Sequence, residues 1–130
     1  MRETLRTRCS EVNYDADGIV YWSYHEGVRI DGDDARCEME TVAQFLERFE
    51  LLPARLMIDI RSIGSISREA RAIYAEPEAS TFAVALLVES AISRVIGNAF
   101  LFWSKPAHPT RLFTHEAKAH AWLSASTPPT

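Results

Sequence analysis

The segment from Arg61 to Arg71 holds the residues best suited to chemistry in this 130-residue chain. It follows an apolar run that predicts a central β-strand, and it leads into a predicted helix. Free backbone N–H groups and the helix dipole favour a bound anion at such a helix start. Side-chain donors come from five positions: Arg61, Ser65, Ser67, Arg68 and Arg71. The segment is therefore predicted to bind an anion or a partner. The alternative is an ordinary crossover loop with solvated arginines.

Two further groups of residues resemble metal sites, and their spacing argues against both. His115 and His120 are five positions apart, whereas a zinc helix needs histidines four apart so that both rings share one face. The acidic residues that begin at Asp31 lack the ligand spacing of a calcium loop and fit a capped helix start instead. No metal site and no cofactor are expected.

Asp59 and His25 are the candidates for a general base in a small hydrolase or isomerase. Asp59 has no His or Cys near it in the sequence, and Glu69 is the second carboxylate that comes closest. The sequence contains no G-x-S-x-G, P-loop or G-x-G-x-x-G motif. We therefore expect that the protein is not an enzyme.

Composition narrows the class of partner and the compartment. The net charge is −4, and the 14 basic residues are scattered singly among 18 acidic ones, which argues against binding to nucleic acid or an anionic membrane. The longest apolar stretches are too short to span a bilayer, and residues 1–6 lack the apolar core of a signal peptide. Cys9 and Cys37 fit reduced thiols. We expect a cytoplasmic protein without membrane insertion.

Hydrophobic periodicity predicts the elements that position these residues. The predicted strands are Cys9–Tyr14, Ile19–His25, Val28–Ile30, Arg55–Ile60, Thr81–Val88 and Thr110–Phe113, and the predicted helices begin near Asp31 and at caps Ser67, Ser90 and Thr114. The first two strands flank a turn signal and form an antiparallel hairpin, and strands that alternate with helices predict parallel crossovers. Residues 1–130 are thus expected to form one α/β domain. It has a mixed sheet with parallel core strands, an N-terminal hairpin and about four helices, ordered over about 9–123.

Several local signatures in this order resemble a known family. The segment Met57 to Ser67 is a hydrophobic strand ending in Asp, then a short loop and a helix cap. It resembles the central motif of the STAS domains, the sulfate-transporter and anti-sigma-factor-antagonist family. The stretch from Pro109 to Leu123 looks like the closing strand and helix of uncharacterised bacterial SpoIIAA-like proteins, and Val95–Asn98 with Phe100 is similar to the same group. The resemblance implies a SpoIIAA-like fold.

The same resemblance implies a possible phosphorylation switch. In signalling members, a Ser one step inside the helix after the central loop is phosphorylated to control partner binding. Arg68 stands at that position in this chain, and its neighbour Ser67 fits a helix cap better than a phosphorylation site.

The helix that begins after Ser90 is predicted to bury Ile92, Val95, Ile96, Ala99 and Trp103, and near its end it becomes apolar on all sides. An interface formed by Phe100, Phe102 and Trp103 would cover that end in a homodimer or with a protein partner. Alternatively, the following loop and the last helix cover it.

We therefore expect a non-enzymatic domain similar to the STAS and SpoIIAA-like proteins, which forms a homodimer and has a regulatory or protein-interaction role. The alternative is a small-molecule or lipid-binding domain. Its cavity would lie between the sheet and the helix from Ser90 to Trp103, as resemblance to lipid-binding relatives of this fold implies.

Overall fold

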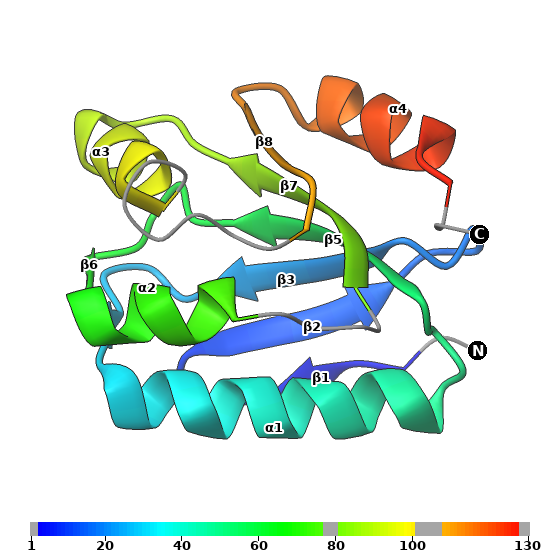
Figure 1. Cartoon of the computed structure of the whole chain (residues 1–130), viewed down its shortest axis with the longest axis horizontal. Coiled ribbons are helices and arrows are strands. Elements are labelled where there is room, and N and C mark those ends of the chain that lie inside the picture. The colour runs from blue at the N-terminus through cyan, green and yellow to red at the C-terminus, as the bar shows by residue number, and fades with distance from the viewer. Residues whose placement is uncertain (1–2, 77–80, 101–107, 128–130) are drawn as a thin grey trace.

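The computed structural model describes residues 3–76, 81–100 and 108–127. A six-stranded sheet with the order β1-β2-β3-β5-β7-β8 forms the centre, and β4 and β6 form a separate two-stranded sheet (Figure 1). The strands are β1 Leu5–Arg6, β2 Ser10–Tyr14, β3 Val20–Tyr24, β4 Arg29–Ile30, β5 Ala54–Asp59, β6 Ser65–Ile66, β7 Thr81–Leu87 and β8 Thr110–Phe113. The helices are α1 Gly32–Arg48, α2 Arg68–Ala75, α3 Ala91–Ala99 and α4 Glu116–Ala125.

The parallel strands at the centre confirm the predicted fold class. β5 pairs in parallel with β3 on one side and with β7 on the other, and β8 extends the sheet in parallel beyond β7. All seven residues of β7 are buried, as expected for a strand that is covered on both faces. The hairpin of β2 and β3 is antiparallel, and β1 adds a short antiparallel edge strand that the sequence did not predict.

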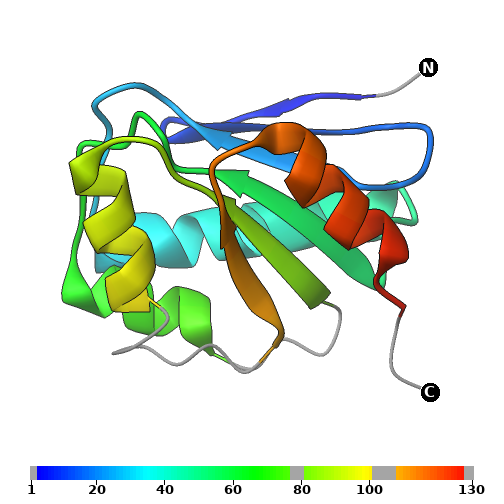
Figure 2. The ribbon, with the colours of Figure 1, turned by 90° about the horizontal axis from the view of Figure 1, so that it is seen from above.

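The helices cover the two faces of the sheet unequally. Side chains such as Trp22, Leu56 and Val84 form a core with α1, whereas Met57 and Ala85 point to the other face and pack against α4. Helices α1 and α2 lie side by side, and Figure 2 shows α3 and α4 on opposite sides of β7 and β8. One face is therefore covered by α1, α2 and α3, and the other by α4.

Three of the four predicted helix caps are confirmed. Asp31 caps α1 in a reciprocal capping box with Asp34, while Ser67 caps α2 and Ser90 caps α3 through their hydroxyl groups. The prediction of Thr114 as the last cap is wrong by one residue. His115 occupies that position, and its side chain makes no capping hydrogen bond.

The predicted inner face of α3 is confirmed at Ile96, which packs against the core, but is wrong at Ile92 and Val95. Ile92 and Val95 are 59% and 68% exposed, whereas Ser93 and Gly97 are buried against the sheet. A Cβ atom at Gly97 would lie 2.9 Å from a methyl carbon of Leu112, so the close approach of this helix depends on a glycine. The helix therefore packs through its small residues and leaves two large apolar side chains exposed.

Candidate ligand-binding cavity

A partly enclosed cavity of about 90 Å³ lies between the sheet and the helices of its α1–α3 face. Its walls come from β3, β5 and β7 below and from α1, α2 and α3 above, and most of the lining side chains are aliphatic or aromatic. Trp22, Ile58 and Leu86 line it from the strands, and Leu46 and Phe100 line it from the helices. An apolar cavity with a few polar groups is the usual form of a small-molecule site.

The polar groups of the cavity wall include three buried donors without a partner. These are Nε1 of Trp22, Nε of Arg71 and the hydroxyl of Tyr74, and none has a hydrogen-bond partner in the part of the chain that the structure describes. Trp22 is only 3% exposed, so water does not satisfy its indole N–H. Leaving a buried donor unsatisfied is costly, and each such group in a folded protein calls for a physical explanation.

Tyr24 and Tyr74 form an aromatic corner of the cavity together with Trp22. The rings of Trp22 and Tyr74 meet edge to face with their centroids 6.0 Å apart, and Trp22 stacks on Tyr24 at 5.8 Å. Burial raises the pKa of Tyr24 and of Tyr74 well above the usual value, and each hydroxyl also affects the pKa of the other. Because their pKa values are raised, both phenols remain protonated at neutral pH.

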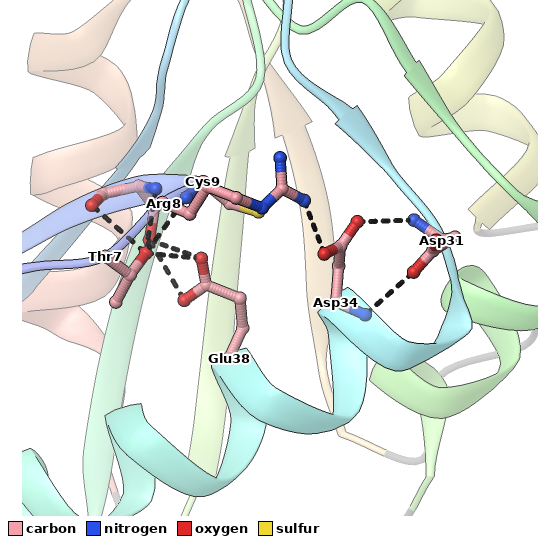
Figure 3. Close-up of polar contacts among 7 residues, drawn as sticks. Thr7, Arg8, Cys9, Asp31, Asp34 and Glu38 are labelled. Atoms are coloured by element: carbon pink, nitrogen blue, oxygen red, sulfur yellow. Dashed lines mark hydrogen bonds and ion pairs between the residues drawn. The ribbon is translucent and has the colours of Figure 1, made fainter.

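Helix α1, which forms one wall, is fixed to the β1–β2 loop by the buried carboxylate of Glu38. The hydroxyl of Thr7 donates to Oε1 of Glu38 at 2.6 Å, and the hydroxyl of Ser10 lies 3.2 Å from both carboxylate oxygens (Figure 3). A folded protein tolerates a buried carboxylate when the carboxylate accepts several hydrogen bonds, because these offset the cost of burying its charge. The polar contacts of Glu38 therefore hold α1 in place and leave its apolar side for the cavity.

The start of α1 carries a second polar contact with the same loop. Arg8 forms an ion pair with Asp34, and the hydrogen bond from Arg8 is the main cause that lowers the pKa of the Asp34 carboxyl (Figure 3). Cys9 lies beside this pair and is buried, and burial raises the pKa of its thiol to about 11. Because the thiolate is the nucleophilic form, Cys9 is a core residue and not a reactive thiol.

The five residues of the predicted anion-binding loop do not all face one place. Arg61 forms a two-point ion pair with Asp59, with Nη2 at 2.8 Å from Oδ2 and Nε at 3.0 Å from Oδ1. The hydroxyl of Ser67 accepts the N–H of Ala70 as a helix cap, and Arg68 is exposed on α2. Ser65 belongs to β6 and pairs with β4. Anion binding at this loop stays a prediction.

Arg71 is the member of that loop that lines the cavity. Its Nη1 donates to the carbonyl of Ile66 at 3.2 Å, which leaves Nε without a partner. Arg71 and Tyr74 are three positions apart on α2, so they lie on the same side of this helix. The predicted loop and the cavity therefore share one residue.

The predicted interface residues are placed only in part. Phe100 is buried and lines the cavity, whereas Phe102 and Trp103 lie outside the described residues. The other candidates for chemistry are engaged elsewhere. Asp59 is held by Arg61, and the ring of His25 contacts the carbonyl of Thr7 at 3.2 Å.

His120 contacts a carboxylate that lies far from it in the sequence. Its Nε2 lies 3.2 Å from Oδ2 of Asp15, 105 positions away, and the carboxylate of Asp17 is within 4.8 Å of both. These three side chains are potential metal ligands. Asp15 also accepts the N–H groups of Asp17 and Ile19, at 2.9 and 3.0 Å, so turn formation and the contact with α4 account for the cluster.

A cavity between the sheet and the helix that begins after Ser90 is expected from the resemblance only as an alternative, because the lining residues themselves carry no distinctive sequence signal. Trp22, Val42 and Leu56 have the spacing of core residues, and most residues with that spacing fill a core completely. Arg71 is a predicted anion-binding residue because it lies near a helix start. An aromatic residue and an arginine three apart on a helix, as in Arg71 and Tyr74, are compatible with a cavity but do not predict one.

Comparisons with known proteins agree on the fold and assign no activity. Residues 13–127 match a family model described as Domain of unknown function (DUF7793). A crystal structure of an uncharacterised protein of the DUF3478 family from Shewanella loihica PV-4, described as having a SpoIIAA-like fold, is 12% identical with a TM-score of 0.57. The alignment covers 95% of this chain and 92% of that one. No curated protein matches the chain.

The comparisons confirm the predicted SpoIIAA-like fold, since the TM-score exceeds 0.5 over nearly the whole length of both chains. Within the described residues, no helix is both long enough and apolar enough to cross a membrane.

Proposed function

The chain belongs to the DUF7793 family, and from this premise we propose that it is a binding domain without catalytic activity whose cavity takes a small, mainly apolar ligand. The observation that carries the proposal is the cavity itself, which has mostly apolar walls and three buried donors that have no partner among residues 3–76, 81–100 and 108–127. Such a site offers burial for an apolar body and a few hydrogen bonds to orient it.

The side chains around the cavity favour binding over catalysis. The lining residues that the structure describes include Thr81 and His108 but no Asp, Glu, Ser or Cys. The carboxylate of Asp59, the candidate base, is occupied by Arg61. A hydrolase or isomerase needs a base and a nucleophile or acid that converge on one cleft. The free Cys9 and Cys37 support a cytoplasmic location, as the sequence predicted.

Titration with hexan-1-ol tests the proposal. The alcohol is neutral and small enough for the cavity, and Trp22 in the wall reports binding through its fluorescence. At ten times its dissociation constant, a ligand specific for the folded state stabilises that state by about 1.4 kcal/mol, which thermal unfolding detects. We expect saturable binding together with a rise in Tm.

A matched pair of variants locates the binding. Leu86→Phe adds volume at the cavity wall and is expected to abolish the hexan-1-ol effect, whereas Leu52→Phe makes the same exchange at an exposed position and leaves it intact. Circular dichroism verifies that both variants are folded. If the wild type shows no saturable binding, or if both variants bind equally well, the cavity is not the site.

The exposed apolar side chains of α3 favour a second candidate function, the regulatory or protein-interaction role that the sequence predicted. Ile92 and Val95 are three positions apart and therefore adjacent on the helix surface. If they form a homodimer interface, Val95→Glu gives a monomer by light scattering, whereas Arg94→Glu on the same helix does not. An unchanged mass for both variants would remove this candidate.

A further inference from the structure

The unpartnered groups of the cavity wall are hydrogen-bond donors. An indole N–H and a guanidinium N–H can only donate, and the hydroxyl of Tyr74 has its proton free to donate as well. Trp22 contributes one of these donors and Arg71 another. A ligand that complements them must therefore present acceptor atoms.

The three residues that carry these donors are neighbours in the cavity wall, with Arg71 and Tyr74 on α2 and Trp22 on β3. Arg71 and Tyr74 are neighbours on the same side of α2. The ring of Tyr74 contacts the ring of Trp22 edge to face, with an interplanar angle of 88°. An acceptor group in this part of the cavity therefore lies beside all three side chains.

Arg71 brings a positive charge to this corner of the cavity. Among the described residues, Arg71 has no carboxylate within ion-pair distance. Glu38, whose charge raises the pKa of Tyr74, is hydrogen-bonded to Thr7 and Ser10 and does not line the cavity. A half-buried guanidinium beside two neutral donors favours an anionic acceptor.

The size of the cavity limits the rest of the ligand. One water needs roughly 10–15 Å³ of such volume, so about 90 Å³ holds a molecule on the order of six to ten non-hydrogen atoms. Among the described residues, the remaining walls are mostly aliphatic and aromatic, and Tyr24, Thr81 and His108 are the other polar side chains.

From these observations we infer that the ligand is a small monocarboxylate, with its carboxylate on Arg71, Trp22 and Tyr74 and its apolar body against the sheet. The inference rests on the proposed function and makes it more specific. A planar two-oxygen acceptor matches the donor fork of an arginine, and its second oxygen is free for the indole and phenol donors.

Calorimetric titration at pH 7 with sodium hexanoate and with hexan-1-ol tests the inference, because the two probes have the same number of carbons and differ at the polar end. The wild-type protein is expected to bind hexanoate about tenfold more tightly, the effect of a few charge-assisted hydrogen bonds. Equal affinity, or tighter binding of the alcohol, would overturn the carboxylate assignment and leave the apolar site intact. If neither probe binds, the proposed function fails as well.

Variants on α2 decide whether Arg71 holds the carboxylate. Arg71→Met is expected to remove the preference for hexanoate, Arg71→Lys to keep part of it, and Tyr74→Phe to reduce it a few-fold. In each of these variants, the affinity for hexan-1-ol is expected to fall less than the affinity for hexanoate.

Arg68→Met is the matched control, since Arg68 lies on the same helix but is exposed. It should leave both affinities unchanged. A loss of hexanoate binding in Arg68→Met but not in Arg71→Met would assign the anion to the outer loop and contradict the inference. Arg71→Lys keeps the test valid if Arg71→Met does not fold.

Discussion

The α4 face of the sheet is closed by side chains that leave no exposed area at Ala119 and Leu123, whereas the α1–α3 face leaves a cavity of about 90 Å³. The polar groups of the two faces also differ, because, in the part of the chain that the structure describes, those on the α4 face have hydrogen-bond partners and several on the cavity face do not. On the α4 face, Asp15 is bonded to His120, and Nη2 of Arg55 donates to the carbonyl of Asp17 at 2.7 Å. On the cavity face, three buried donors have no partner among the described residues.

This difference indicates that the two faces serve different purposes. Close packing and satisfied polar groups on the α4 face contribute to stability. An unfilled space with unsatisfied donors on the other face reduces stability unless a ligand supplies the missing contacts. A difference of this kind within one sheet is expected of a binding domain, because functional sites are where local packing rules are broken.

The largest expected effect compares truncations of a leucine on each face. Leu123→Ala on the α4 face removes contacts on all sides of a closed core and should lower the free energy of unfolding by about 4 kcal/mol. Leu46→Ala borders a space that is already empty, so its cost should be about 2 kcal/mol. Urea unfolding measures both. Equal losses would mean that the two faces are packed alike.

Enlarging the side chain at two neighbouring positions of β7 should change the stability of the protein in opposite directions. Ala85→Val places extra volume against α4 and should destabilise the protein by about 1–3 kcal/mol. Val84→Ile places a methylene toward the cavity and should be neutral or stabilise by up to about 1 kcal/mol. Thermal unfolding compares them directly. A destabilising Val84→Ile would contradict the presence of usable space on that face.

The acid dependence of stability should come in part from the α4 face. Burial disfavours the Asp15 carboxylate, but the hydrogen bonds from Ile19, His120, Asp17 and Tyr21 outweigh it and lower its pKa below 3.8. Because the folded-state pKa is depressed, this contribution is fully present above about pH 4 and is lost as the pH falls through the folded-state value.

Asp15→Asn tests this contribution. It should cost about 1 kcal/mol at pH 7 through its weaker hydrogen bonds, and the loss should shrink as the pH is lowered toward 2. Urea unfolding at several pH values measures the difference. If the wild type and the variant differ by the same amount at every pH, the Asp15 contacts do not act through its charge.

The smallest expected effect compares two tyrosine hydroxyls. Tyr21 donates to Oδ2 of Asp15 at 3.3 Å on the α4 face, and Tyr21→Phe should cost about 0.5–1 kcal/mol. The hydroxyl of Tyr74 has no partner, so Tyr74→Phe should be neutral or slightly stabilising, by less than about 1 kcal/mol. A clear loss in Tyr74→Phe would show that its hydroxyl is satisfied in solution.

Elements with strong local signals could be predicted from the sequence. The fully apolar run of β7 indicated a central strand, and Asp31, Ser67 and Ser90 indicated helix starts, because each cap depends on residues within three positions. The strands β1 and β6 were missed, since each has two residues and is defined only by its partner strand.

The inner face of α3 could not be predicted from hydrophobicity. Periodicity favours Ile92 and Val95 as inner residues. In the structure, Gly97 faces the sheet, and the helix approaches so closely there that any side chain would collide with Leu112. The contact between Asp15 and His120 joins residues 105 positions apart, which no local pattern shows.

The cavity was an alternative expectation that came from the resemblance, and hydrophobic periodicity could not establish it. Periodicity indicates that Trp22 and Leu86 point inward, but it does not show whether their neighbours fill the space between them. The volume depends on how three helices are placed on one face, and that placement is a property of the whole fold.

The most direct test uses the indole N–H resonances of the three tryptophans in a nitrogen-15 NMR titration with sodium hexanoate. Trp22 lines the cavity and Trp122 packs on the α4 face against Phe113, so each reports on one face. Trp22→Phe and Trp122→Phe assign the two resonances. We predict that the Trp22 resonance shifts saturably while that of Trp122 stays in place. A stationary Trp22 resonance at saturating hexanoate and hexan-1-ol would contradict the account.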